Sequence, residues 1–334
     1  MPKLIIKVVF LFRDKSVVNL VFLVLLFLGI HWAIFLLPPL PTTDPANGFL
    51  GTGIHRVTQA WTGAILTPLF LLAVVLQAVR LNVVFNEWKL FVGAGYTVSL
   101  AYVLLSGTLM VFFYHSPALW YNFGLLWQLE RLVKLYNDPK PKTLLFNLGW
   151  VSGLLFLAYH PALVFLPVLF LALGILRPFR LQEWLMLLLG LFLPVYFLFS
   201  WYFLTDQWTA INGLLPQFDL GLPAQWLSPA QWVAVGLMGL SFLVGFVYWQ
   251  QFNGRATIQI RKTWGVLFLT TWVAFLAPFL FAQHGLETAW LALLPLSVFV
   301  SNVFSFPRRL WLPNLFFWLF VALAIWQNWL WLKK

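Results

Sequence analysis

The sequence predicts an all-α polytopic membrane protein with about eleven transmembrane helices, in a range of about nine to twelve. Hydrophobic residues make up 62% of the 334 residues and charged residues only 9%, against roughly 25% charged residues in soluble domains. Apolar runs of about the length that crosses a bilayer follow one another, separated by short polar stretches. Basic residues gather in every second stretch, which is typical of a multi-pass protein.

The whole chain, residues 1–334, is expected to form one integral membrane domain. Residues 1–15 mix apolar and basic side chains, which indicates a segment at the cytoplasmic membrane interface. Hydropathy places the spans at about residues 16–37, 60–78, 90–113, 118–129, 144–157, 162–176, 183–203, 229–249, 264–281, 288–304 and 310–332. Several spans are short or contain proline, so we expect broken helices among them.

The distribution of positive charge predicts the orientation. With a cytoplasmic N-terminus, 17 of the 20 Lys and Arg residues lie inside, and Arg56, Lys333 and Lys334 lie outside. This is a strong positive-inside bias. The first outer loop is then residues 38–59, and the long outer loop is residues 204–229, which contain no Lys or Arg. We therefore expect a multi-pass membrane protein with its N-terminus in the cytoplasm.

Several classes of function are disfavoured by composition and motifs. The chain has no Cys, which excludes disulfides and thiolate metal sites. Its net charge of +11 is scattered in short clusters between apolar runs, so a nucleic-acid partner is not expected. No phosphate-binding glycine loop, serine nucleophile elbow or closely spaced histidine motif is present, and we expect no metal and no cofactor.

Titratable residues gather on the outer side in this topology. His31 lies in the outer half of the first span, and the other outer residues are His55, His115, His160, His284, Asp44, Asp206, Asp219 and Glu287. Each one alone also fits a solvated loop, but the set indicates a site that faces outward. The candidate substrate-binding residues are His55, Arg56, Asp206, Trp208, His284 and Glu287.

These acids suggest a transferase that uses a lipid-linked donor. Asp44 follows the first span closely, and a carboxylate there is a candidate general base for an acceptor hydroxyl that attacks a polyprenyl-phosphate sugar. The leaving group is a lipid phosphate at the headgroup level. Arg56, the only outer Arg, or a protonated outer His is positioned to stabilise its charge.

Two resemblances bear on this hypothesis. The N-terminal FRDKS and the stretches LFNLGWVSGLLFLAYHPALVFLPVLFLALGILRPFRLQEW and LLLGLFLPVYFL resemble an uncharacterised family of multi-pass inner-membrane proteins of Bacteroidota, best over about residues 143–198. More remotely, an acid in the first outer loop and short paired helices in the middle resemble the C-type, membrane-embedded glycosyltransferases. That resemblance implies surface helices in a larger first outer loop than residues 38–59.

The motif RPFRLQEW faces the cytoplasm in this topology. Arg180 and Glu183 are three residues apart at a helix start, which predicts an ion pair there. Arg177 and Trp184 are expected to anchor at lipid headgroups. The alternative is a contact site for a cytoplasmic partner.

Three functions stay open from the sequence. The leading one is a C-type-like glycosyltransferase at the outer face, with membrane lipids and a lipid-linked sugar as its ligands. The second is a non-catalytic subunit or scaffold of an envelope or secretion complex, with protein partners in the membrane. The third is a transporter of lipid or lipid-linked glycan, for which proline-broken helices are typical.

Overall fold

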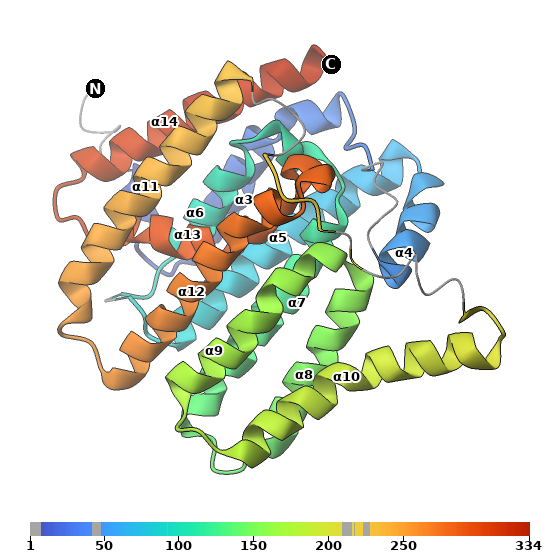
Figure 1. Cartoon of the computed structure of the whole chain (residues 1–334). Helices are drawn as coiled ribbons and strands as arrows, with labels where there is room; N and C mark the ends of the chain where they lie inside the picture. The colour runs from blue at the N-terminus through green and yellow to red at the C-terminus, as the bar shows by residue number, and fades with distance from the viewer. Residues whose placement is uncertain (1–7, 42–47, 92, 209–215, 217, 223–227) are drawn as a thin grey trace.

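The computed structural model describes residues 8–41, 48–91, 93–208, 216, 218–222 and 228–334. These residues form helices and, apart from two isolated bridges, no β-structure, which confirms the all-α class (Figure 1). The α-helices are α2 (Val8–Leu11), α3 (Val17–Ile30), α4 (Phe49–Gln59), α5 (Gly63–Glu87), α6 (Thr97–Ser106), α7 (Pro117–Lys134), α8 (Lys142–Ala158), α9 (Leu166–Leu176), α10 (Leu181–Leu204), α11 (Pro229–Asn253), α12 (Ile258–Leu280), α13 (Trp290–Ser305) and α14 (Trp311–Leu332). The 3-10 helices are η1 (Trp32–Phe35), η2 (Met110–Phe113), η3 (Leu135–Asn137), η4 (His160–Phe165) and η6 (Ala282–Ala289).

Six helices of the described chain are long and apolar enough to cross a membrane. They are α5, α10, α11, α12, α14 and the stretch Leu286–Ser305, which contains α13. Shorter apolar helices are α3, α6, α8 and the combined stretch His160–Leu176. Each expected span contains a helix of the described chain, so hydropathy located these apolar helices. The total of about eleven crossings and the cytoplasmic N-terminus stay predictions.

The expected third span, residues 90–113, is not one continuous helix. Among its described residues, only α6 and the short η2 are helical, and all ten residues of α6 are buried. Gly95 approaches the N-terminal turn closely, because a Cβ at this position would lie 2.6 Å from the carbonyl oxygen of Arg13. The Gly95 carbonyl also accepts a hydrogen bond from Asn82 Nδ2 at 2.8 Å. This segment therefore packs against the N-terminal turn instead of extending α6.

The helices α8 and α10 pack with unusually close backbones. A Cβ on Gly149 would lie 2.2 Å from the carbonyl oxygen of Leu187, and one on Gly190 would lie 2.2 Å from that of Phe146. Gly149 and Gly153 form a GxxxG motif, the pattern that lets two membrane helices approach this closely. The stretches GWVSG and GLFLP, which carry the resemblance noted above, therefore have a packing role.

The positively charged loops meet at one end of the helix bundle. Arg13 donates to the carbonyl oxygens of Phe304 at 2.8 Å and Pro307 at 2.7 Å. Lys262 Nζ donates to the carbonyl oxygen of Leu176 at 3.2 Å. We name the end that carries Arg13, Arg80, Arg177, Arg255, Lys262 and Arg308 the basic end. Loops predicted to lie on the same side of the membrane therefore contact one another.

Arg177 is not the headgroup anchor that the sequence suggests. Its side chain is only 11% exposed, and its Nε donates to Glu183 Oε2 at 3.0 Å. Its Nη1 also donates to the carbonyl oxygens of Leu135 and Asp138, at 2.6 and 2.8 Å. The expected pair of Arg180 with Glu183 is present but longer, at 3.7 Å. The RPFRLQEW motif therefore ties the start of α10 to the loop before α8.

A glycine substitution tests the α8–α10 contact. Gly190→Ala should lower the thermal unfolding temperature of the purified protein in detergent, because overpacking against a backbone costs about 1–3 kcal/mol. The matched control is Gly174→Ala in α9, where a Cβ would have no neighbour within 4 Å. Equal unfolding temperatures for the two variants would contradict the close packing.

Candidate functional site

The first loop contains a short surface helix, α4, which the hydropathy of the sequence does not predict. Gly48 precedes it with φ of 95°, in the left-handed region that favours glycine. A Cβ on Gly48 would also lie 2.3 Å from the carbonyl oxygen of Leu157. Glycine is therefore required here, and it fixes the start of α4 against the C-terminal end of α8.

His55 and Arg56 lie in the last two turns of α4. His55 is partly buried, and its Nε2 accepts a hydrogen bond from Gln59 Nε2 at 2.6 Å. Thr58 Oγ1 donates to the backbone carbonyl of His55 at 3.1 Å. Arg56 is exposed and forms no ion pair with any described residue. Its guanidinium is available to an anion that approaches this end of the bundle.

Asp206 and Trp208 follow the C-terminal end of α10. Asp206 is exposed and has φ of 54°, so the chain turns sharply at this residue. Trp208 is 59% exposed, and its ring lies edge-on to that of Phe203 with 6.1 Å between centroids. Both side chains are therefore open to a ligand.

The remaining described candidates belong to η6. Glu287 is partly buried in this element, which packs against α12 and α13. Asp219 of the long loop is held next to η6 by two backbone hydrogen bonds. Asp219 N donates to Leu280 O at 3.2 Å, and Ala282 N donates to Asp219 O at 3.0 Å. The side chain of His284 and the whole of Asp44 lie outside the described part of the chain.

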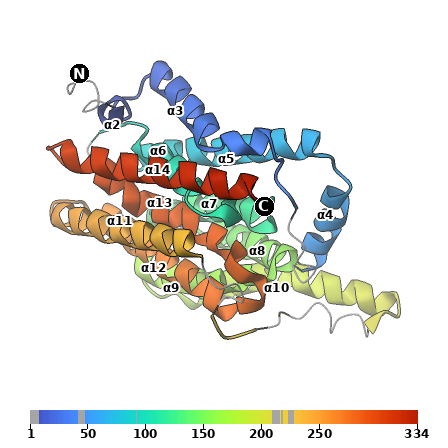
Figure 2. The same cartoon turned by 90° about the horizontal axis from the view of Figure 1, so that it is seen from above.

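The described candidates are thus divided among α4, the end of α10 and η6. Both α4 and α10 pack against α8, and Figures 1 and 2 show α4 and the end of α10 on the same side of the molecule. No described hydrogen bond links Arg56 to Asp206 or Trp208. Arg56, Asp206 and Trp208 are therefore exposed on the same side of the molecule, with no described contact among them.

Three of the histidines that the sequence groups with these residues are buried in helix packing. His31 is fully buried, and its ring nitrogens lie 3.2 and 3.3 Å from the carbonyl oxygens of Phe27 and Ser106. His115 and His160 are also buried, at 4% and 5% exposure. Their position after apolar runs could have indicated burial as easily as a loop. His31, His115 and His160 therefore contribute to helix packing and are not part of an exposed outer site, contrary to the prediction from the sequence.

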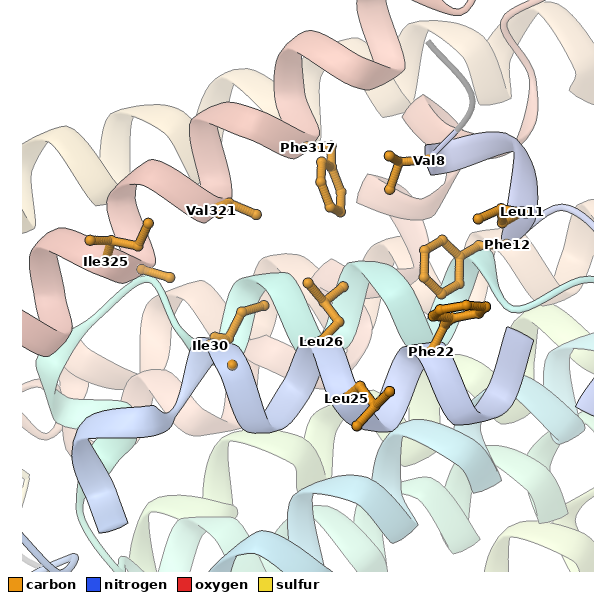
Figure 3. A pocket seen from close by; sticks show the side chains of 12 residues that line it. Val8, Leu11, Phe12, Phe22, Leu25, Leu26, Ile30, Phe317, Val321 and Ile325 are labelled. Atoms are coloured by element: carbon orange, nitrogen blue, oxygen red, sulfur yellow. The ribbon is translucent and has the colours of Figure 1, made fainter. Parts of the chain in front are cut away.

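An apolar cavity of about 480 Å³ opens between α2, α3 and α14. Figure 3 shows Leu26, Ile30, Phe317 and Val321 pointing toward this space from the facing helices. None of the described residues that line it is titratable. These residues therefore supply no acid, base or nucleophile to a reaction.

The chemistry of the described residues is limited in kind. No three His, Cys, Asp or Glu side chains among them lie close enough together to hold a metal ion. Comparisons with protein-family models, curated proteins and solved structures find no match. Function is therefore inferred from the residues of this chain.

Sequence reasoning missed the partner of His115. Trp120 Nε1 donates to His115 Nε2 at 3.1 Å, across the start of α7. The spacing alone gives a weak signal, because a histidine and a tryptophan five residues apart meet only where a helix begins between them. Burial lowers the pKa of His115 below its ordinary value of 6.5. The fold therefore favours the neutral ring, whose Nε2 is able to accept this bond.

His115 should make stability depend on pH. The unfolded chain binds a proton at the ordinary pKa, and the folded chain binds it only at lower pH. The stabilisation is therefore complete above about pH 6.5 and is lost as the pH falls. When the pH is lowered from 7.5 to 5.5, the thermal unfolding temperature of the wild type should fall further than that of His115→Gln. An equal drop in both proteins would show that His115 does not contribute.

Proposed function

We propose that the protein is a membrane-embedded glycosyltransferase of the C-type kind, which moves a sugar from a polyprenyl-phosphate carrier to an acceptor. The observation that carries this proposal is α4, a surface helix in the loop after the first apolar helix. Such a helix is what the resemblance to the C-type enzymes implies for this loop. With the N-terminus in the cytoplasm of a bacterium of the Bacteroidota kind, α4 lies on the outer face of the inner membrane.

Asp44 is the proposed general base of this reaction. Its carboxylate takes the proton of an acceptor hydroxyl as that oxygen attacks the anomeric carbon of the sugar. The new bond joins the acceptor oxygen to the anomeric carbon, and the bond that breaks joins this carbon to the phosphate oxygen. The electron pair leaves with the polyprenyl phosphate, so negative charge develops at the phosphate. Arg56, exposed on α4, is placed to stabilise that charge.

The other candidates are assigned to substrate binding. Trp208 offers an exposed aromatic face, on which the apolar side of a sugar ring can stack. Asp206 offers hydrogen-bond acceptors for sugar hydroxyls beside it. His55 on α4, and His284 and Glu287 in η6, are assigned to substrate binding as well.

A non-catalytic membrane subunit is the second candidate, and α10 is the element that favours it. The outer half of α10 extends away from the rest of the bundle in Figures 1 and 2. Its side chains Tyr196, Trp201 and Phe203 are between 62% and 68% exposed. Such an aromatic surface suits a neighbouring membrane helix as well as it suits lipid.

Asp44→Asn separates these two candidates. In cells that lack the native gene, this variant should fail to restore transfer, because loss of a general base costs about 10²–10⁴-fold in rate. Polyprenyl-phosphate sugar should then accumulate in lipid extracts, as measured by mass spectrometry. Asp219→Asn is the control, since Asp219 is an exposed acid that uses its backbone for contacts. Donor levels in Asp44→Asn cells that equal those of the wild type would favour the subunit.

Arg56 provides a second test of the transferase. Arg56→Gln should slow transfer at least about tenfold without lowering the unfolding temperature, because the side chain has no ion pair to lose. Arg56→Lys should recover part of the rate, since it keeps the charge but loses the bidentate geometry. Full activity of Arg56→Gln in the same lipid assay would remove Arg56 from the site.

A further inference from the structure

A second polar surface lies at the basic end, in a groove between α11 and the turn that joins α13 to α14. The groove has a volume of about 480 Å³. Arg255 forms one side, after the end of α11, and Arg308 and Arg309 form the other. Tyr248 and Trp311 contribute aromatic walls. Three arginines therefore line one groove.

The three arginines of the groove have no described acceptor, unlike Arg13, Arg80 and Arg177 at the same end. Arg13 is bound to two backbone carbonyls, and Arg80 Nη2 donates to Glu130 Oε2 at 2.6 Å. Arg255, Arg308 and Arg309 are exposed, and no described residue forms an ion pair or side-chain hydrogen bond with them. Like charges gathered without a counter-ion favour binding of an anion, and guanidinium groups match the geometry of phosphate oxygens.

The same helix faces become apolar toward the middle of the bundle. On α11, Arg255 is preceded at helical spacing by Gln251, Tyr248, Val244 and Leu240. On α14, Leu312 of the groove is followed at helical spacing by Leu315 and Leu319, which are 48% and 42% exposed. The two helices pack against each other and lie side by side in Figures 1 and 2. The surface is thus cationic at its end, aromatic next, and aliphatic beyond.

This order matches one class of molecule, an anionic phospholipid. We propose that the groove binds the phosphate headgroup of such a lipid, with its acyl chains along α11 and α14. Basic pockets between membrane helices on the cytoplasmic side bind acidic headgroups in this way. A soluble phosphate compound would use the arginines but not the aliphatic surface. The proposal does not depend on the glycosyltransferase assignment.

Native mass spectrometry of the full-length protein in detergent tests the site. Phosphatidylglycerol should remain bound, and zwitterionic phosphatidylcholine should not. The triple variant Arg255→Gln, Arg308→Gln, Arg309→Gln should weaken phosphatidylglycerol binding at least about tenfold. The matched control removes three other exposed cations at the same end, as Lys15→Gln, Lys89→Gln, Arg261→Gln. It should retain wild-type binding.

Other outcomes overturn the proposal. An equal loss in both triple variants would mean that net charge alone attracts the lipid. Unchanged binding in the arginine variant would place the lipid elsewhere. Displacement of the lipid by millimolar inorganic phosphate would identify a soluble phosphate ligand instead. If the glutamine variant fails to fold, the variant with lysine at all three positions keeps the charge, and it should bind phosphatidylglycerol more weakly than the wild type but more tightly than phosphatidylcholine.

Discussion

The fold depends on polar side chains that bond to the backbone groups left free where apolar helices stop. Asn328 Nδ2 donates to the carbonyl oxygen of Ile30 at 2.6 Å, and Asn328 Oδ1 accepts from Ala33 N at 3.0 Å. Trp331 Nε1 donates to the carbonyl oxygen of Leu37 at 3.0 Å. In hydrocarbon, a backbone group without a partner costs several kcal/mol, because no water replaces the bond. α3 is therefore able to end inside the bundle because α14 supplies these bonds.

The same solution limits which polar residues are available for function. Asn82 donates a hydrogen bond to the carbonyl of Gly95, and Arg177 donates to two backbone carbonyls in addition to its ion pair with Glu183. A side chain used in this way is fixed, and moving it would expose a buried carbonyl or carboxylate. His31, which bridges two helices through backbone oxygens, belongs to the same group. Arg56 at one end of the bundle, and Arg255, Arg308 and Arg309 at the other, form no ion pair with any described residue and remain available to ligands.

The sequence located the helices because the hydropathy of each run depends on its own residues. It failed where a distant backbone decides the local structure. α4 begins where Gly48 contacts Leu157, which lies more than a hundred residues later in the chain. Arg177 is predicted to be exposed, but its side chain is mostly buried by its contact with the loop before α8. The candidate site could be predicted only as a set of residues on one side, since residues such as Arg56 carry no information about which neighbour faces them.

The two ends of the bundle differ in how many Lys and Arg they carry and in the partners of these side chains, and both functional proposals depend on this difference. The positive-inside rule by itself explains many Lys and Arg at the basic end. A site for an anion is therefore indicated there only by a cluster that lines a groove, as Arg255 and Arg308 do. At the other end, Lys334 lies 4.6 Å from the ring of Tyr114 and Lys333 lies 5.1 Å from that of Trp329. Among the described residues assigned to that face, Arg56 is then the cation without a partner. A phosphate that reaches this face therefore meets one guanidinium, so a single substitution is able to reveal it.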